Sequence, residues 1–97
     1  MIYRFEPEAP VVGVTFKVRG RVCPSERGVF TGVVTVDADM PQHGHGMNYR
    51  PRVRLESATG EFIAEGFVLH MPGLWRFRFK LVDGTSRETL YFEHLAK

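Results

Sequence analysis

Hydrophobic and polar residues alternate along most of this chain. The apolar residues that recur at every second position are, in chain order, Val12, Val14, Phe16 and Val18; Val34 and Val36; Val53 and Leu55; Trp75, Phe77, Phe79 and Leu81; and Leu90 and Phe92. A period of two is that of a β-strand with one buried face, and no window carries the 3.6-residue apolar stripe of a helix. The pattern predicts strands near residues 12–18, 31–38, 51–57, 61–69, 74–82 and 87–94.

Turn-forming residues separate these segments, as in Ala58-Thr59-Gly60 and Asp83-Gly84. Six or seven short antiparallel strands within 97 residues predict an all-β sandwich of immunoglobulin-like type that forms a single domain over residues 1–97. Hydrophobic residues make up 43% and charged residues 25% of the chain, as in an ordinary globular protein. No apolar run approaches the roughly 20 residues that a membrane-spanning helix needs.

Side chains that bind metals are concentrated in two short segments. Three of the four histidines and three of the four methionines lie within Met40–Met47 and His70–Gly73. Imidazole nitrogen and thioether sulfur form a ligand set that suits copper, and Cu(I) above all, whereas zinc prefers thiolate, imidazole and carboxylate. The composition of these segments therefore points to copper, with histidine also permitting Cu(II).

The spacing within the segments suggests which residues act as ligands. His43 and His45 lie two residues apart, so in an extended segment they share a side, and Gly44 between them imposes no steric obstacle. Met47 repeats that spacing. His70 and Met71 are adjacent and would point to opposite faces of a strand. The predicted ligands are His43, His45, Met47 and His70, with Met40 and Met71 in reserve.

The predicted topology brings the two segments together. If the strands near 31–38, 51–57, 61–69 and 74–82 alternate in direction, the first and the third finish at the same end of the sandwich. Met40–Met47 follows the first strand, and His70-Met71 terminates the third. We therefore expect a single binding rim built from segments more than twenty residues apart.

The same residues carry a family resemblance. Met40-Pro41-Gln42-His43-Gly44-His45-Gly46-Met47, followed by Gly66 and by His70-Met71-Pro72-Gly73-Leu74-Trp75-Arg76-Phe77, resembles the signature of the YtkA-like or FixH-like small β-sandwich domains of bacteria. The resemblance spans roughly residues 30–82. Such domains are similar to periplasmic copper carriers and are linked to copper supply for respiratory oxidases. The resemblance implies an extracytoplasmic, metallochaperone-like domain with a copper donor or recipient protein as its partner, and it allows a membrane anchor outside this chain.

The N-terminus and the single cysteine add less. The first six residues lack the apolar segment of a secretory signal, so we expect either a cytoplasmic protein or the mature part of a longer precursor. Cys23 has no second cysteine to pair with, and we expect a free thiol. No serine, cysteine or carboxylate lies in a recognisable catalytic motif, so we expect no enzymatic activity.

Several simpler interpretations stay open. Met40, Met47 and Met71 are also suited to filling gaps in a core, and a metal-free immunoglobulin-like interaction module is the main alternative function. Trp75 is expected to anchor the core, and Asp37 and Asp39 to be solvated charges at a strand end.

Basic residues suggest a third function, anion binding. Two basic triplets, Arg50, Arg52 and Arg54, and Arg76, Arg78 and Lys80, could form such a face, although the net charge is only +2. We expect them to be solvated and paired across strands with Glu56, Glu61, Glu65, Glu88 and Glu93. We do not expect nucleic-acid binding, because the aromatic residues of these strands point the other way, into the core.

Overall fold

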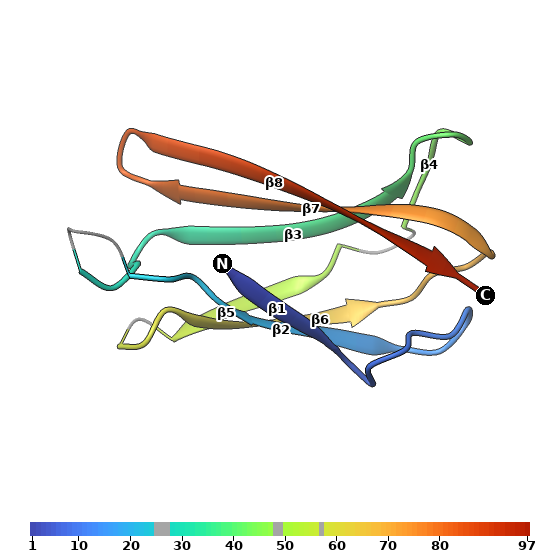
Figure 1. Ribbon diagram of the computed structural model, residues 1–97, viewed down its shortest axis with the longest axis horizontal. Coiled ribbons are helices and arrows are strands. Elements are labelled where there is room, and N and C mark those ends of the chain that lie inside the picture. The colour runs from blue at the N-terminus through green and yellow to red at the C-terminus, as the bar shows by residue number, and fades with distance from the viewer. Residues whose placement is uncertain (25–27, 48–49, 57) are drawn as a thin grey trace.

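The protein folds as two antiparallel β-sheets packed face to face (Figure 1). The computed structural model describes residues 1–24, 28–47, 50–56 and 58–97, apart from the side chain of His45. The strands are β1 (Ile2–Glu6), β2 (Phe16–Arg21), β3 (Val33–Met40), β4 (His45–Gly46), β5 (Arg52–Glu56), β6 (Glu61–Phe67), β7 (Gly73–Asp83) and β8 (Ser86–Ala96). One sheet has the order β1-β2-β6-β5 and the other β4-β3-β7-β8. The predicted all-β, antiparallel sandwich is confirmed.

Strand β7 explains how the alternating sequence builds the core. Trp75, Phe77 and Phe79 are fully buried, whereas Arg76 and Arg78 between them lie on the outer face. Phe77 contacts Phe5 of the opposite sheet with ring centroids 5.1 Å apart, and further aromatic pairs cross the interior in the same way. The predicted separation of aromatic and basic side chains to opposite faces of this strand is confirmed.

The N-terminal region differs from the prediction. A strand expected over 12–18 begins only at Phe16, and Val14 is 50% exposed. Gly13 has φ +82° and donates its N–H to the carbonyl of Leu69, while the N–H of Val14 bonds back to Val11, so the chain turns here instead of extending. The sequence interpretation also omitted β1, which pairs with β2 along its whole length.

Strand β6 carries an irregularity and ends at Phe67, whereas the sequence predicted a strand over residues 61–69. Val18 lies opposite Ala64 and Phe16 opposite Phe67, so β6 holds one extra residue between these pairs. Such an extra residue is a β-bulge, and a glycine with positive φ accommodates it well. Gly66 has φ +92° and is exposed, and the bulge lets Phe67 return to the buried face three residues after Ala64.

Candidate functional site at the His/Met rim

The two segments rich in histidine and methionine lie at the same end of the sandwich. Strand β3 ends at Met40, and the antiparallel strand β7, which begins at Gly73, pairs Arg76 with Asp39. The connection from β6 to β7, residues 68–72, therefore lies beside the end of β3 (Figure 1). We call residues 40–47 and 70–73 the His/Met rim. This convergence agrees with the strand-direction argument from the sequence.

Met40 lies beneath the rim, in the core. Its side chain is fully buried, and a Cβ added to Gly73 would lie only 2.7 Å from its terminal methyl carbon. Gly73 also has φ +132°, a conformation that favours glycine. A thioether enclosed in this way is not accessible to an ion at the surface. Met40 therefore fits the alternative role of a core residue and not that of a reserve ligand.

The segment after Met40 forms a hairpin with the end of β3. Residues 41–44 form a turn in which the N–H of His43 donates to the carbonyl of Met40, at 3.1 Å. The two residues of β4 then pair back, Gly46 with Asp39 and His45 with Met40. His43 is exposed at this turn, whereas the side chain of the predicted ligand His45 lies outside the described residues.

The other two methionines of the rim are half-buried. Met47 follows β4 and Met71 lies in the connection between β6 and β7, and both pack against the same core that encloses Met40. Their sulfur atoms thus belong to side chains that reach from the core to the surface. In this they differ from Met40, and they remain candidates for binding a soft metal ion.

Trp75 holds the other half of the rim in place. Its indole Nε1 donates a hydrogen bond of 3.0 Å to the carbonyl of Met71, and its ring meets the imidazole of exposed His70 edge-on at 5.4 Å. Trp75 itself is fully buried, as the sequence predicted for a core anchor. One rigid side chain therefore fixes both the backbone at Met71 and the neighbourhood of His70.

A hollow of about 660 Å³ opens on the outer face beside β4, lined by Met47, Gly44 and Gly46 and by charged residues of β3 and β7. Asp39 pairs with Arg76 at 3.2 Å and Asp37 with Arg78 at 3.4 Å across these strands. The expectation that both aspartates are simply solvated strand-end charges was wrong, because the register of β3 on β7 places each one opposite an arginine.

Two residues that line this hollow also carry buried polar atoms that the sequence interpretation did not identify. Within the described part of the chain, Asp39 Oδ1 and Arg76 Nε are buried without a hydrogen-bond partner. The Asp39–Arg76 ion pair therefore leaves one buried acceptor and one buried donor whose hydrogen-bonding capacity it does not use. The sequence could have indicated these atoms only through the opposite charges of Asp39 and Arg76. Recognising that the two residues pair requires knowledge of the strand register.

The two basic triplets do not form one face. Arg52 and Arg54 lie on β5 in the first sheet, and Arg76, Arg78 and Lys80 on β7 in the second. Arg54 pairs with Glu65 at 2.8 Å, as expected, but Arg76 and Arg78 use the aspartates of β3. Arg50, from the first triplet, is exposed. It lines the hollow together with Arg76 and Arg78 of the second triplet.

No protein-family model, curated protein or solved structure matches this chain. What it does is therefore inferred from its own residues. Among the residues that the structure describes, no three His, Cys, Asp or Glu side chains gather as a metal-binding group. The described residues include no helix with the length and apolar character required to cross a membrane.

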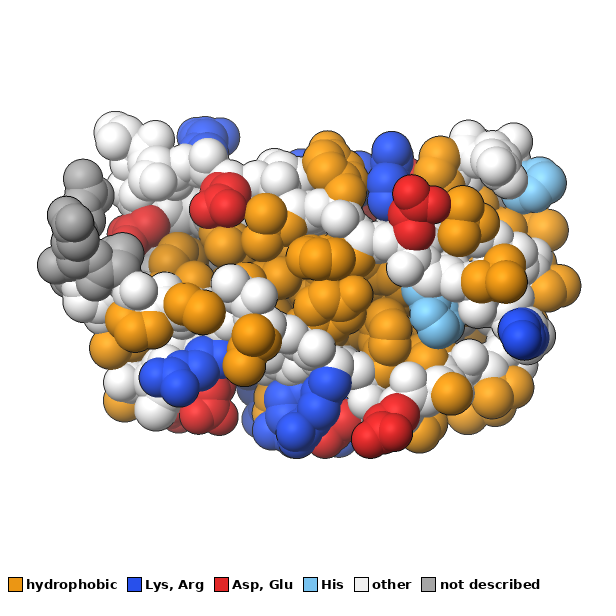
Figure 2. Space-filling view, viewed as in Figure 1, with side chains coloured by type: hydrophobic (Ala, Val, Ile, Leu, Met, Phe, Trp, Pro, Cys, Tyr) orange, Lys and Arg blue, Asp and Glu red, His pale blue; other side chains and the backbone are white. Residues whose placement is uncertain are grey.

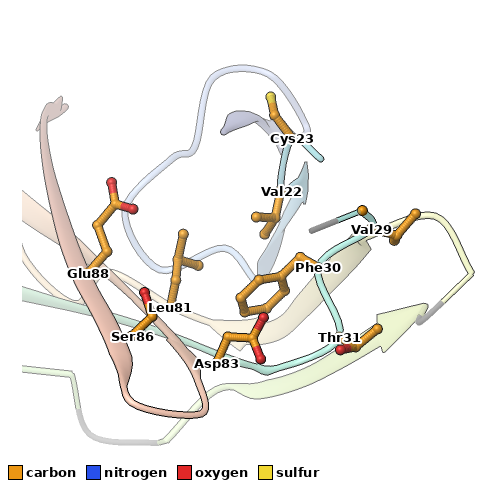
Figure 3. A pocket seen from close by; sticks show the side chains of 10 residues that line it. Val22, Cys23, Val29, Phe30, Thr31, Leu81, Asp83, Ser86 and Glu88 are labelled. Carbon is orange, nitrogen blue, oxygen red and sulfur yellow. The ribbon is translucent and has the colours of Figure 1, made fainter. Parts of the chain in front are cut away.

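A second hollow, of about 630 Å³, lies at the opposite end of the sandwich (Figure 3). Val22, Phe30 and Leu81 point toward one another there, and Asp83, Ser86 and Glu88 lie around them. Cys23, at the edge of this hollow, is exposed and carries the free thiol that the sequence predicted. Cys23 is therefore separated from the candidate metal site by the length of β3 and β7.

The fourth histidine, His94, packs against the core. The ring is half-buried on β8, with its centroid 5.1 Å from that of Phe5 and 6.5 Å from that of Phe77. Desolvation in this apolar environment lowers the pKa of His94 below its ordinary value near 6.5.

The sandwich is therefore expected to lose stability as the pH falls below about 6.5. In that window the unfolded chain binds a proton at His94 that the folded chain does not yet bind, so acidification favours unfolding. Urea unfolding midpoints at neutral and mildly acidic pH measure the effect. The variant His94→Gln should show a shallower dependence on pH, and an undiminished slope would contradict the role given to His94.

Proposed function

We propose that the His/Met rim binds one copper ion and that the domain holds this ion for transfer to or from a partner protein. The observation that carries the proposal is the convergence of the two segments at one end of the sandwich, with Met40 packed against Gly73 at their junction. The ligands we assign are His43, His70 and Met47, with Met71 in reserve. His45 is retained from the sequence, since its side chain lies outside the described residues.

The chemistry of these donors supports copper over harder metals. Two exposed imidazoles and two half-buried thioethers form a soft to borderline set, which Cu(I) prefers and which zinc rarely uses. Met40 does not fit the site, because its sulfur is enclosed. The exposure of His43 and His70 suits an exchange of ligands with a second protein, and we assign no catalytic step to the domain.

The strand order of the two sheets is compatible with the immunoglobulin-like sandwich that the resemblance to copper-handling domains implies. Named in chain order, the strand orders β1-β2-β6-β5 and β4-β3-β7-β8 become ABED and C′CFG, the order of immunoglobulin-like sandwiches. Trp75 lies on the strand that corresponds to F, whereas antibody domains carry their buried tryptophan on C. We infer an immunoglobulin-like topology from strand order. From the resemblance to YtkA-like and FixH-like domains, we place the domain in the periplasm or another extracytoplasmic compartment.

A pair of methionine variants tests the site with an internal control. Met47→Leu replaces a half-buried thioether and should weaken Cu(I) binding about tenfold or more, whereas Met40→Leu replaces an enclosed thioether of similar volume and should leave the affinity unchanged. Both affinities are measured by titrating Cu(I) into each protein against a competing chelator, with Zn(II) in parallel.

The result of the titration also decides between the two candidate functions. Binding of one Cu(I) per chain that depends on Met47 and not on Met40 supports the copper site. A chain that fails to compete for copper at all would refute it and would favour the metal-free interaction module. Equal losses in the two methionine variants would contradict the assignment of Met47 as a ligand and of Met40 as a core residue.

A further inference from the structure

One side of the sandwich leaves the edges of both sheets uncovered. Strands β1 and β8 are the terminal strands of their sheets, and within the described residues each pairs with a single neighbour, β2 and β7 respectively. The two lie on the same side, because Tyr3 of β1 contacts Phe92 of β8 with ring centroids 4.8 Å apart. We call this the open side. An unpaired edge presents backbone donors and acceptors that another strand can bind.

The open side is apolar at its centre. Hydrophobic side chains gather between the two sheet edges in Figure 2, and charged side chains lie around them. Tyr3, Phe5, Leu90 and Phe92 fill this seam half-buried, and Tyr91 next to it is 55% exposed. An apolar centre with a polar rim is the usual anatomy of a protein interface.

We propose that a second copy of this chain covers the open side, with the two β8 strands paired antiparallel about a two-fold axis. An antiparallel pairing of one strand with itself is self-complementary, so a single type of contact closes the dimer. The two four-stranded sheets that contain β8 then become one continuous sheet of eight strands. The inference is independent of the copper site, which lies at the end of the sandwich.

The charges along β8 select the register. If Leu90 lies opposite Leu90 of the second copy, Arg87 lies opposite Glu93 of that copy, and the pair occurs twice by symmetry. Arg87 and Glu93 are both exposed, and among the described residues neither forms an ion pair within its own chain. Thr89 then faces Tyr91 of the second copy, a combination of β-branched and aromatic residues that stabilises neighbouring strands. The register also brings the apolar seams of the two copies together across the axis.

Charge reversal tests the contact in the intact chain. Arg87→Glu places like charges opposite each other twice and should weaken dimerisation about tenfold, and Glu93→Arg should do the same. The double variant Arg87→Glu, Glu93→Arg restores opposite charges and should recover the dimer. Lys80→Glu changes an exposed charge on the interior strand β7 of the same sheet and serves as the matched control, with no expected effect. Sedimentation velocity over a range of concentrations measures the association.

A cysteine test checks the register directly. In a Cys23→Ser background, Leu90→Cys places one thiol opposite its symmetry mate, at a separation that a disulfide can span. Mild oxidation should therefore link the two chains, whereas Glu88→Cys, which would face Phe92 of the second copy, should not form the link. A monomeric wild-type chain at every concentration, or a double charge variant that dimerises no better than the single variants, would overturn the proposal.

Discussion

Replacing His43 and His70 together by glutamine is expected to weaken Cu(I) binding at least about a hundredfold. Even a residue that only orients a metal ligand is worth about 10- to 100-fold in affinity, so the loss of two imidazoles from opposite halves of the rim should exceed that range. Both side chains are exposed, and the fold should survive their exchange. Competition with a Cu(I) chelator measures the affinity, and circular dichroism confirms that the variant is folded.

A third histidine provides the control for this variant. His94 packs against Phe5 of the opposite sheet, and His94→Gln should leave copper affinity at neutral pH within a factor of about two, which is a change of about 0.4 kcal/mol. His45→Gln, measured in the same series, assigns the side chain that lies outside the described residues. An affinity that stays unchanged when His43 and His70 are both replaced would disprove the ligand assignment.

The largest loss of stability is expected from Trp75→Ala, which should lower the free energy of unfolding by about 3–5 kcal/mol. The side chain is completely buried, so its removal leaves a cavity, and the carbonyl of Met71 loses its hydrogen bond to Nε1. Urea unfolding followed by far-ultraviolet circular dichroism measures the change.

Two further variants separate the causes of this loss. Trp75→Phe keeps an aromatic ring in the core but removes the indole N–H, so it should fall between the wild type and alanine and should also reduce copper affinity by loosening the connection at Met71. Val33→Ala truncates a side chain that is 63% exposed and should change stability by no more than about 0.5 kcal/mol. If Trp75→Ala were as stable as Val33→Ala, the anchoring role of Trp75 would be wrong.

Alternation was sufficient to predict the layers of this fold. Along β7, every second residue from Trp75 to Leu81 is buried and the residues between them point outward, which a period of two requires. The convergence of residues 40–47 and 70–73 could also be predicted, since it depends only on how often the chain reverses direction. Strand β1 carried the same signal, with Tyr3 and Phe5 facing inward, and could have been found from it.

Local backbone events could not be predicted in the same way. Val12 and Val14 have the spacing of a strand, but the hydrogen bonds at Gly13 and Val14 turn the chain away from the sheet. The bulge at Gly66 shifts the alternation of β6 by one residue, and nothing in the order of apolar residues marks where such a shift occurs. In both places a glycine adopts a positive φ that the pattern alone does not specify.

The details of the candidate site depended on register and packing. Whether a methionine is a ligand or a core residue cannot be decided from its type, and only the structure, through the complete burial of Met40 and its packing against Gly73, identifies it as enclosed. The aspartates of β3 acquire their arginine partners through a register between strands, and the paired residues lie 37 and 41 positions apart in the sequence. The sequence thus identified the rim, while the structure distinguished its buried methionine from the two that reach the surface.

The position of Trp75 gives this protein an optical signal of its own. It is the single tryptophan in the chain, it is enclosed, and its ring lies 5.4 Å from the imidazole of His70. Its fluorescence spectrum therefore comes from one environment, directly beside a proposed ligand. The arrival of a quenching metal ion at His70 should therefore alter the emission intensity without any added label, while unfolding should shift the emission to longer wavelength.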